Sequence, residues 1–101
     1  MSVVTNLILT CAAGGEEKAI AYINAAMIDD LHQQPITDTR EAATGTKWLE
    51  AGVFITACNY LDLPEFLSAV QSAPWESPES VQVFYQEQDD NRFTEAKLNL
   101  N

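Results

Sequence analysis

Positively charged residues are scarce in this sequence. Five Lys and Arg stand against fifteen Asp and Glu, so the formal charge is −10 at pH 7. A surface of this sign repels phosphate backbones and anionic lipid headgroups, which disfavours nucleic acid and membrane as direct partners. It favours a basic protein, for example one with a nucleic-acid-binding groove. An acidic surface that serves only solubility is the alternative explanation.

The residues on which most catalytic and metal sites depend are also few. There is one histidine, His32, and there are two cysteines, Cys11 and Cys58. The glycines form neither the G-x-G-x-x-G pattern of dinucleotide-binding loops nor a G-K-[ST] phosphate loop, and no triad spacing, nucleophile elbow or zinc motif occurs. We therefore expect no metal and no cofactor, and enzymatic activity has no positive support.

Long hydrophobic runs are absent as well. The longest run, AGVFITAC, is far shorter than the roughly 20 residues that cross a bilayer. The first residues, MSVVTNLILTC, carry no basic segment before their apolar stretch, so we expect no signal peptide and a cytoplasmic location. A hydrophobic content of 47% over 101 residues is typical of one folded domain, which we expect to span 1–101.

The first half of the chain predicts a strand, a helix and a short edge strand. The segment SVVTNLILTC is rich in β-branched residues and leucine without strict alternation, as in a strand that is buried on nearly both faces. After AAGG, apolar residues recur at three- and four-residue intervals from Glu16 to Leu31, which is typical of an amphipathic helix. A polar stretch over 36–46 can hold a short edge strand.

The second half predicts a long strand, a second helix and a hairpin. KWLEAGVFITACNY is typical of a strand, and DLPEFLSAVQSA of a helix whose N-terminus has Asp62 as its cap and Glu65 three residues later. The runs VQVFYQEQ and RFTEAKLNL are separated by Asp89, Asp90 and Asn91, which favour tight turns. A β-hairpin therefore explains this acidic stretch without a bound ligand.

This order of elements predicts an α+β fold of the ferredoxin-like, split βαβ plan. We expect two helices on one face of a mainly antiparallel sheet, with an extra C-terminal hairpin strand. We also expect the strands that end at Cys11 and Cys58 to be parallel neighbours, an arrangement that allows the two sulfurs to lie close together but does not decide whether they touch. His32 would then lie at the opposite edge of the sheet, so a Cys–His pair is not expected. We interpret both thiols as buried and inert, with a redox pair as the alternative.

A tryptophan lies in the loop SAPWESPES, between two prolines. Loop aromatics anchor partners because they bury a large area at low entropic cost, although this ring can instead cover the end of the sheet. We expect the acidic residues around it and those of the hairpin to be separated by the strand at 81–87. The candidate partner-binding residues are Trp75, Glu76, Glu79, Glu87, Asp89 and Asp90.

Three functional hypotheses follow. The first is a small non-enzymatic module, of inhibitor or immunity type, that binds a basic protein. The second is a small-molecule-binding or enzymatic domain that acts as a homodimer, with Cys11, Tyr22 and Cys58 lining the ligand. The third is a structural protein that self-associates through an exposed edge at 36–46.

Overall fold

The computed structural model describes residues 3–39 and 50–100. The elements run in the order β1 (Val4–Ala12), α1 (Glu17–Asp29), β2 (Thr37–Asp38), β3 (Ala51–Asn59), α2 (Leu63–Ser72), the 3₁₀ turn η2 (Pro78–Ser80), β4 (Gln82–Glu87) and β5 (Thr94–Glu95). The edge strand expected within 36–46 is present as β2, and residues 40–46 of that segment lie outside the described residues. The expected hairpin is formed by β4 and β5.

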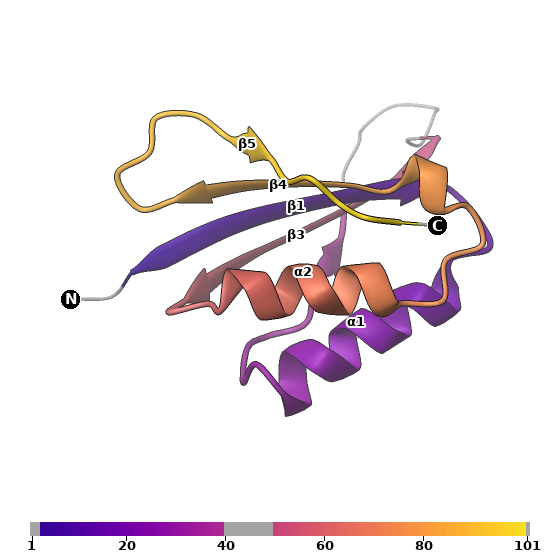
Figure 1. Ribbon diagram of the computed structural model, residues 1–101, viewed down its shortest axis with the longest axis horizontal. Helices are drawn as coiled ribbons and strands as arrows, with labels where there is room; N and C mark the ends of the chain where they lie inside the picture. Colours follow the sequence, from indigo (N-terminus) through magenta and orange to yellow (C-terminus); the bar gives the residue numbers. More distant parts are fainter. Residues whose placement is uncertain (1–2, 40–49, 101) are drawn as a thin grey trace.

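The five strands form one open sheet in the order β2-β3-β1-β4-β5, and every neighbouring pair is antiparallel. Both helices cover the same face of this sheet (Figure 1). The chain is therefore a small α+β protein, as expected. None of the described helices has the length and apolar character needed to cross a membrane.

The core lies between the sheet and the two helices. Strand β1 alternates between buried and half-buried residues, whereas its sequence predicted burial on nearly both faces. Its buried residues point toward the helices, because successive side chains of a strand lie on opposite faces. The side chains that fill this layer are Leu7, Leu9 and Val83 from the sheet, Ala19, Ile23 and Met27 from α1, and Phe66 and Val70 from α2.

Helix α2 begins as its sequence predicts. The side chain of Asp62 accepts a hydrogen bond from the backbone N–H of Glu65 at 3.2 Å, and proline occupies the first turn. This cap satisfies one of the backbone donors that a helix N-terminus leaves unpaired.

The expected proximity of Cys11 and Cys58 is wrong. Strands β1 and β3 are neighbours, but they are antiparallel: Cys11 lies opposite Gly52, and Cys58 lies opposite Thr5. Six positions of β1 separate these two pairs, which is roughly 20 Å along the strand. The strand that follows α1 and runs parallel to β1 is the short β2, and β3 returns between the two, so the chain direction of β3 is reversed.

The second face of the sheet is covered by no described helix, and we call it the open face. Its side chains alternate with the buried ones along each strand, and the register places them in rows across the sheet. In β1, β3 and β4 all of them are uncharged: Val4, Asn6, Ile8, Thr10 and Ala12; Ala51, Val53, Ile55, Ala57 and Asn59; and Gln82, Phe84 and Gln86.

Candidate functional site

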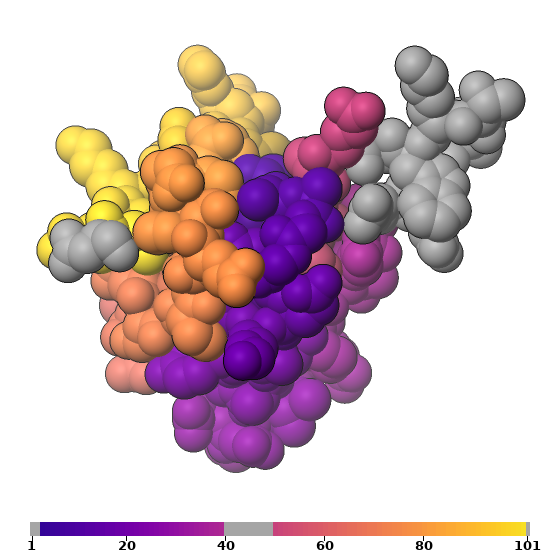
Figure 2. All heavy atoms as spheres, turned by 90° about the vertical axis from the view of Figure 1, so that its right-hand side faces the viewer, coloured from indigo at the N-terminus to yellow at the C-terminus, as the bar shows by residue number. Residues whose placement is uncertain are grey.

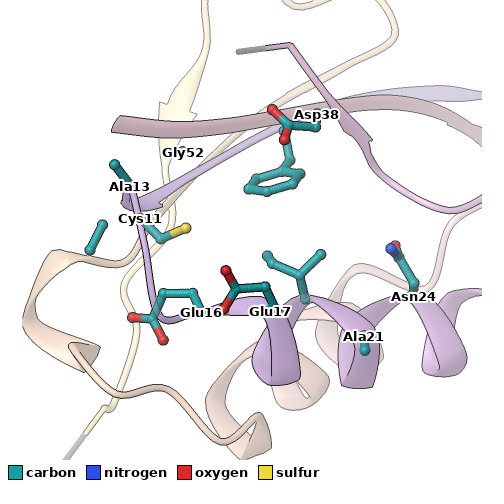
Figure 3. Close-up of a pocket in the computed structure, with 11 residues that line it drawn as sticks. Cys11, Ala13, Glu16, Glu17, Ala21, Asn24, Asp38 and Gly52 are labelled. Atoms are coloured by element: carbon teal, nitrogen blue, oxygen red, sulfur yellow. The ribbon is translucent and has the colours of Figure 1, made fainter. Parts of the chain in front are cut away.

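A pocket of about 360 Å³ lies where β1 enters α1. The end of β1, the first turns of α1, the edge strand β2 and the start of β3 all contribute to its wall (Figure 3). Between β1 and α1 the chain turns at Gly14 and Gly15, and Gly15 has a left-handed φ of 84°. The lining residues are Cys11, Ala12, Ala13, Glu16, Glu17, Ile20, Ala21, Asn24, Asp38, Gly52 and Phe54.

The pocket combines apolar surface with carboxylates. Ile20 and Phe54 supply large apolar side chains, while Glu17 and Asp38 supply exposed acidic ones. Figure 3 shows Glu17 and Asp38 on different elements, with Glu17 on α1 and Asp38 on β2. Such a pocket suits a ligand group that has both an apolar part and a positive charge.

Cys11 is a neutral thiol in this pocket. Burial, followed by the nearby carboxylates of Glu16 and Asp38, raises the pKa of this thiol from its ordinary value of 9.0 to about 11. A β-carbon at Gly52 would lie 2.9 Å from the Cys11 sulfur, so any other residue at this position would require the thiol or the strand to shift. Because the thiolate is the reactive form, Cys11 is a poor nucleophile at neutral pH.

Glu16 is the buried acid of this site, with 4% of its surface exposed. Its two carboxylate oxygens accept hydrogen bonds from the backbone N–H groups of Glu76 at 2.8 Å and Ser77 at 3.0 Å. These bonds attach the start of α1 to the segment that follows α2, and Figure 2 shows the two segments side by side at this end of the molecule. Glu16 is thus a structural anchor and not a free charge.

Sequence reasoning placed Glu16 in the first turn of the helix and missed its anchoring role. The spacing of the apolar residues along the helix already indicated that Glu16 lies on the buried face. Ala19, Ile23 and Met27 are the buried stripe of α1, and extending that stripe back by one turn reaches Glu16. A carboxylate on the buried face of a helix needs hydrogen-bond partners, which indicates an anchor of this kind.

Trp75 packs inward. Its indole N–H donates a hydrogen bond to the Val70 carbonyl at 2.7 Å, and its ring lies against the hydrophobic core. The ring therefore packs inward beside the last turn of α2, whereas the alternative that the sequence left open placed it over the end of the sheet.

The acidic candidates lie in two groups. Glu76 and Glu79 are exposed near η2, whereas Glu87, Asp89 and Asp90 are exposed at the turn between β4 and β5. These groups lie at opposite ends of β4 (Figure 1), as the sequence predicted, so they do not form one surface.

The hairpin turn satisfies its own polar groups. The Asp90 carboxylate accepts a hydrogen bond from the Glu87 backbone N–H at 3.1 Å, and the Asp90 N–H donates to the Glu87 carbonyl at 3.0 Å. Asp89 has a left-handed φ of 76°, a conformation that Asp tolerates better than most residues. Among residues 3–39 and 50–100, no group of three His, Cys, Asp or Glu side chains is arranged to hold a metal ion.

The ligand-lining candidates of the second hypothesis lie in three separate places. Cys11 lines the pocket, whereas Tyr22 is 45% exposed and lines a shallow groove between α1 and α2. Cys58 is buried at the far end of β3. Burial raises the pKa of its thiol, opposed by a hydrogen bond with the Thr56 side chain. The structure does not bring these three residues together.

The expected position of His32 is correct with respect to Cys11 and wrong with respect to Cys58. Gln33 donates a side-chain hydrogen bond to the Asn59 carbonyl at 2.8 Å, so the end of α1 meets the end of β3 that carries Cys58. The reason is again the antiparallel direction of β3. His32 itself is exposed, and Cys58 is 1% exposed.

Comparison of the chain with models of protein families, with curated proteins and with solved structures finds no match. The function has to be inferred from the chemistry of the surfaces described above.

Proposed function

We propose that the chain is a small acidic binding module without catalytic activity, and that its partner is a basic protein. The pocket beside α1 is the observation that carries this proposal. It places the carboxylates of Glu17 and Asp38 next to apolar surface from Ile20 and Phe54. A lysine or arginine side chain of the partner has the matching form, with an apolar stem and a cationic head.

The contacts of such a side chain follow from the lining of the pocket. Its stem would lie against Ile20 and Phe54, and its head would reach Glu17 and Asp38. The Phe54 ring adds the face over which a cation is attracted, a contact of about 0.5–2 kcal/mol. The side-chain oxygen of Asn24 already accepts one hydrogen bond, from the Ile36 N–H at 2.9 Å, which holds this side chain in place beside the pocket.

The charge of the whole chain supports the same partner class. A formal charge of −10 steers a basic protein toward the surface and makes association fast and salt-sensitive. A nucleic-acid-binding groove is a common basic surface, so we propose an inhibitor or immunity-type role against such a protein. Neither nucleic acid nor membrane is the direct partner. Two unpaired cysteines favour a reducing compartment, and we propose the cytoplasm.

We infer that the fold is ferredoxin-like. In the split βαβ plan, a helix connects two parallel strands and another strand lies between them. Here α1 connects β1 to β2, β3 lies between these two strands, and α2 leads to β4 on the other side of β1. Strand β5 is then the additional C-terminal strand. This fold hosts unrelated functions, so it adds nothing to the choice of partner.

The test is a pull-down from lysate of the source cells, washed at about 0.1 M and about 1 M salt, between which the screening length falls from about 10 Å to about 3 Å. We expect a basic protein to be retained at low salt and released at high salt. The pocket variant Glu17→Gln/Asp38→Asn removes two charges, and the control Asp29→Asn/Glu95→Gln removes the same two charges elsewhere. We expect only the pocket variant to lose the partner.

The other outcomes are informative. Equal losses in both variants would mean that net charge, and not the pocket, determines binding. Loss in a third variant, Glu87→Gln/Asp89→Asn, with the pocket variant unaffected would move the site to the hairpin turn. A retained protein that resists high salt would contradict the electrostatic proposal.

The second candidate is a small cationic ligand in the same pocket. Its volume of about 360 Å³ is at the lower end of the 300–1,000 Å³ found for ligand sites, which favours a ligand of this size class. Mass spectrometry of the intact protein under native conditions distinguishes the two candidates. An added mass that disappears in Glu17→Gln/Asp38→Asn would indicate the small ligand.

A further inference from the structure

The centre of the open face is apolar. Ile55, Ile8 and Phe84 lie side by side in one row of the register across β3, β1 and β4. Ile55 is 43% exposed, and a groove of about 590 Å³ runs along this face between β3 and Phe93, which is 42% exposed. The solvated face of an antiparallel sheet is normally polar, and an apolar centre of this kind marks an interaction surface.

The three central strands of the open face carry no charge, in a chain where 20% of residues are charged. On β1, β3 and β4 it carries no Asp, Glu, Lys or Arg, and the nearest charged side chain in the central row is Glu95 on the edge strand β5. Depletion of charge is the feature that distinguishes the core of protein interfaces. A basic partner would need acidic contacts, which this face does not offer.

We propose that the open face binds the open face of a second copy of this chain. Two chains of charge −10 repel each other, so they can meet closely only where neither carries charge. The part of this face on β1, β3 and β4 satisfies that condition. The proposal goes beyond the binding of a basic protein and is independent of it, because the pocket of Glu17 and Asp38 lies on the helix side of the sheet.

The geometry suits a twofold symmetric dimer. Strand β1 is the middle strand of the sheet, and Ile8 lies in the middle of β1. A twofold axis between two such faces therefore brings Ile8 against Ile8 of the second copy, with Ile55 and Phe84 around it. Sheets that pack in this way lie about 10 Å apart, with their inner side chains interdigitated.

The size of the face predicts a concentration-dependent dimer. Strands β1, β3 and β4 present a flat footprint on the order of 400 Å², which side chains enlarge. This is at the low end for stable interfaces, which bury about 800 Å² per partner. Because the remaining surface is acidic, salt should screen the repulsion and strengthen the dimer. Binding of a basic protein has the opposite salt dependence, so the two proposals fail independently.

The test is sedimentation equilibrium of the wild-type chain at about 0.1 M and about 1 M salt. We expect a mass between 11.2 kDa and twice this value that rises with protein concentration and with salt. The variant Ile55→Glu places a charge in the centre of the face and should weaken the dimer by about 30-fold or more, as at an interface hot spot. The matched control is Ile28→Glu on α1, where the isoleucine is 51% exposed and lies away from this face.

A wild-type chain that stays at 11.2 kDa at all concentrations would overturn the proposal. So would equal masses of Ile55→Glu and Ile28→Glu, because the interface would then lie elsewhere. Circular dichroism verifies that each variant is folded. If Ile55→Glu does not fold, Ala57→Glu tests the same face at another exposed position, and a dimer unaffected by that charge would equally refute the proposal.

Discussion

Replacing Glu16 with alanine tests the anchor at the start of α1. The substitution removes two charge-assisted hydrogen bonds and leaves the N–H groups of Glu76 and Ser77 without their acceptor. Hydrogen bonds to charged groups contribute about 1.5–3 kcal/mol each. Part of this loss is offset, because the alanine variant no longer buries a charged carboxylate. We therefore expect the free energy of unfolding to fall by roughly 2–3 kcal/mol in total. Glu16→Gln keeps one acceptor and should lose about half as much.

Urea unfolding followed by tryptophan fluorescence measures this loss. With a slope of about 1–2 kcal/mol per molar urea, the midpoint of Glu16→Ala should fall by roughly 1–2 M. The control is Glu17→Ala, which removes the adjacent, exposed carboxylate. That variant should lose no more than about 1 kcal/mol, the limit of an interaction with the helix dipole. If Glu16→Ala unfolds at the same midpoint as Glu17→Ala, the anchoring role of Glu16 is refuted.

Three further predictions concern the packing and titration of single residues. Gly52→Ala should lower the free energy of unfolding by about 1–3 kcal/mol, because the added methyl group meets the Cys11 sulfur. The double variant Gly52→Ala/Cys11→Ala should recover much of this loss. If the losses of the two single variants simply add in the double variant, the contact is contradicted. The Cys11 pKa is raised on folding from 9.0 to about 11. The contribution of this thiol to the free energy of unfolding is therefore complete below pH 9 and is lost as pH rises through 11. The free energy of unfolding in urea should be lower at pH 10.5 than at pH 8 in the wild type, and this decrease should be smaller in Cys11→Ala. Trp75→Phe keeps an aromatic ring but loses the hydrogen bond to the Val70 carbonyl and part of the packing of the larger indole, so thermal unfolding should show a loss of at least about 1 kcal/mol. An unchanged melting temperature would mean that neither contact stabilises the fold.

Most secondary structure was predictable because its signals are local. The cap at Asp62, the apolar periodicity of α1 and the turn residues Asp89 and Asp90 each act within a few positions of the chain. The order of these elements was then enough to predict two helices on one face of a mainly antiparallel sheet.

The direction of β3 was not predictable from the same signals. The edge strand β2 is only two residues long, and periodicity over so short a segment does not show that it is the parallel partner of β1. The expected proximity of Cys11 and Cys58 failed for this reason. A strand of either direction has the same alternation of side chains, so direction depends on which segments pair across the sheet.

The candidate sites depended still more on tertiary structure. The sequence by itself determined the charge of the chain, the scarcity of catalytic residues and the presence of an exposed acidic turn. Only the fold decided that Glu16 is buried against two backbone N–H groups, that Trp75 turns inward, and that Glu17 and Asp38 share a pocket. Only the register aligned the uncharged residues of three strands into one face. Burial and proximity arise from contacts between residues far apart in the chain, which local composition does not encode.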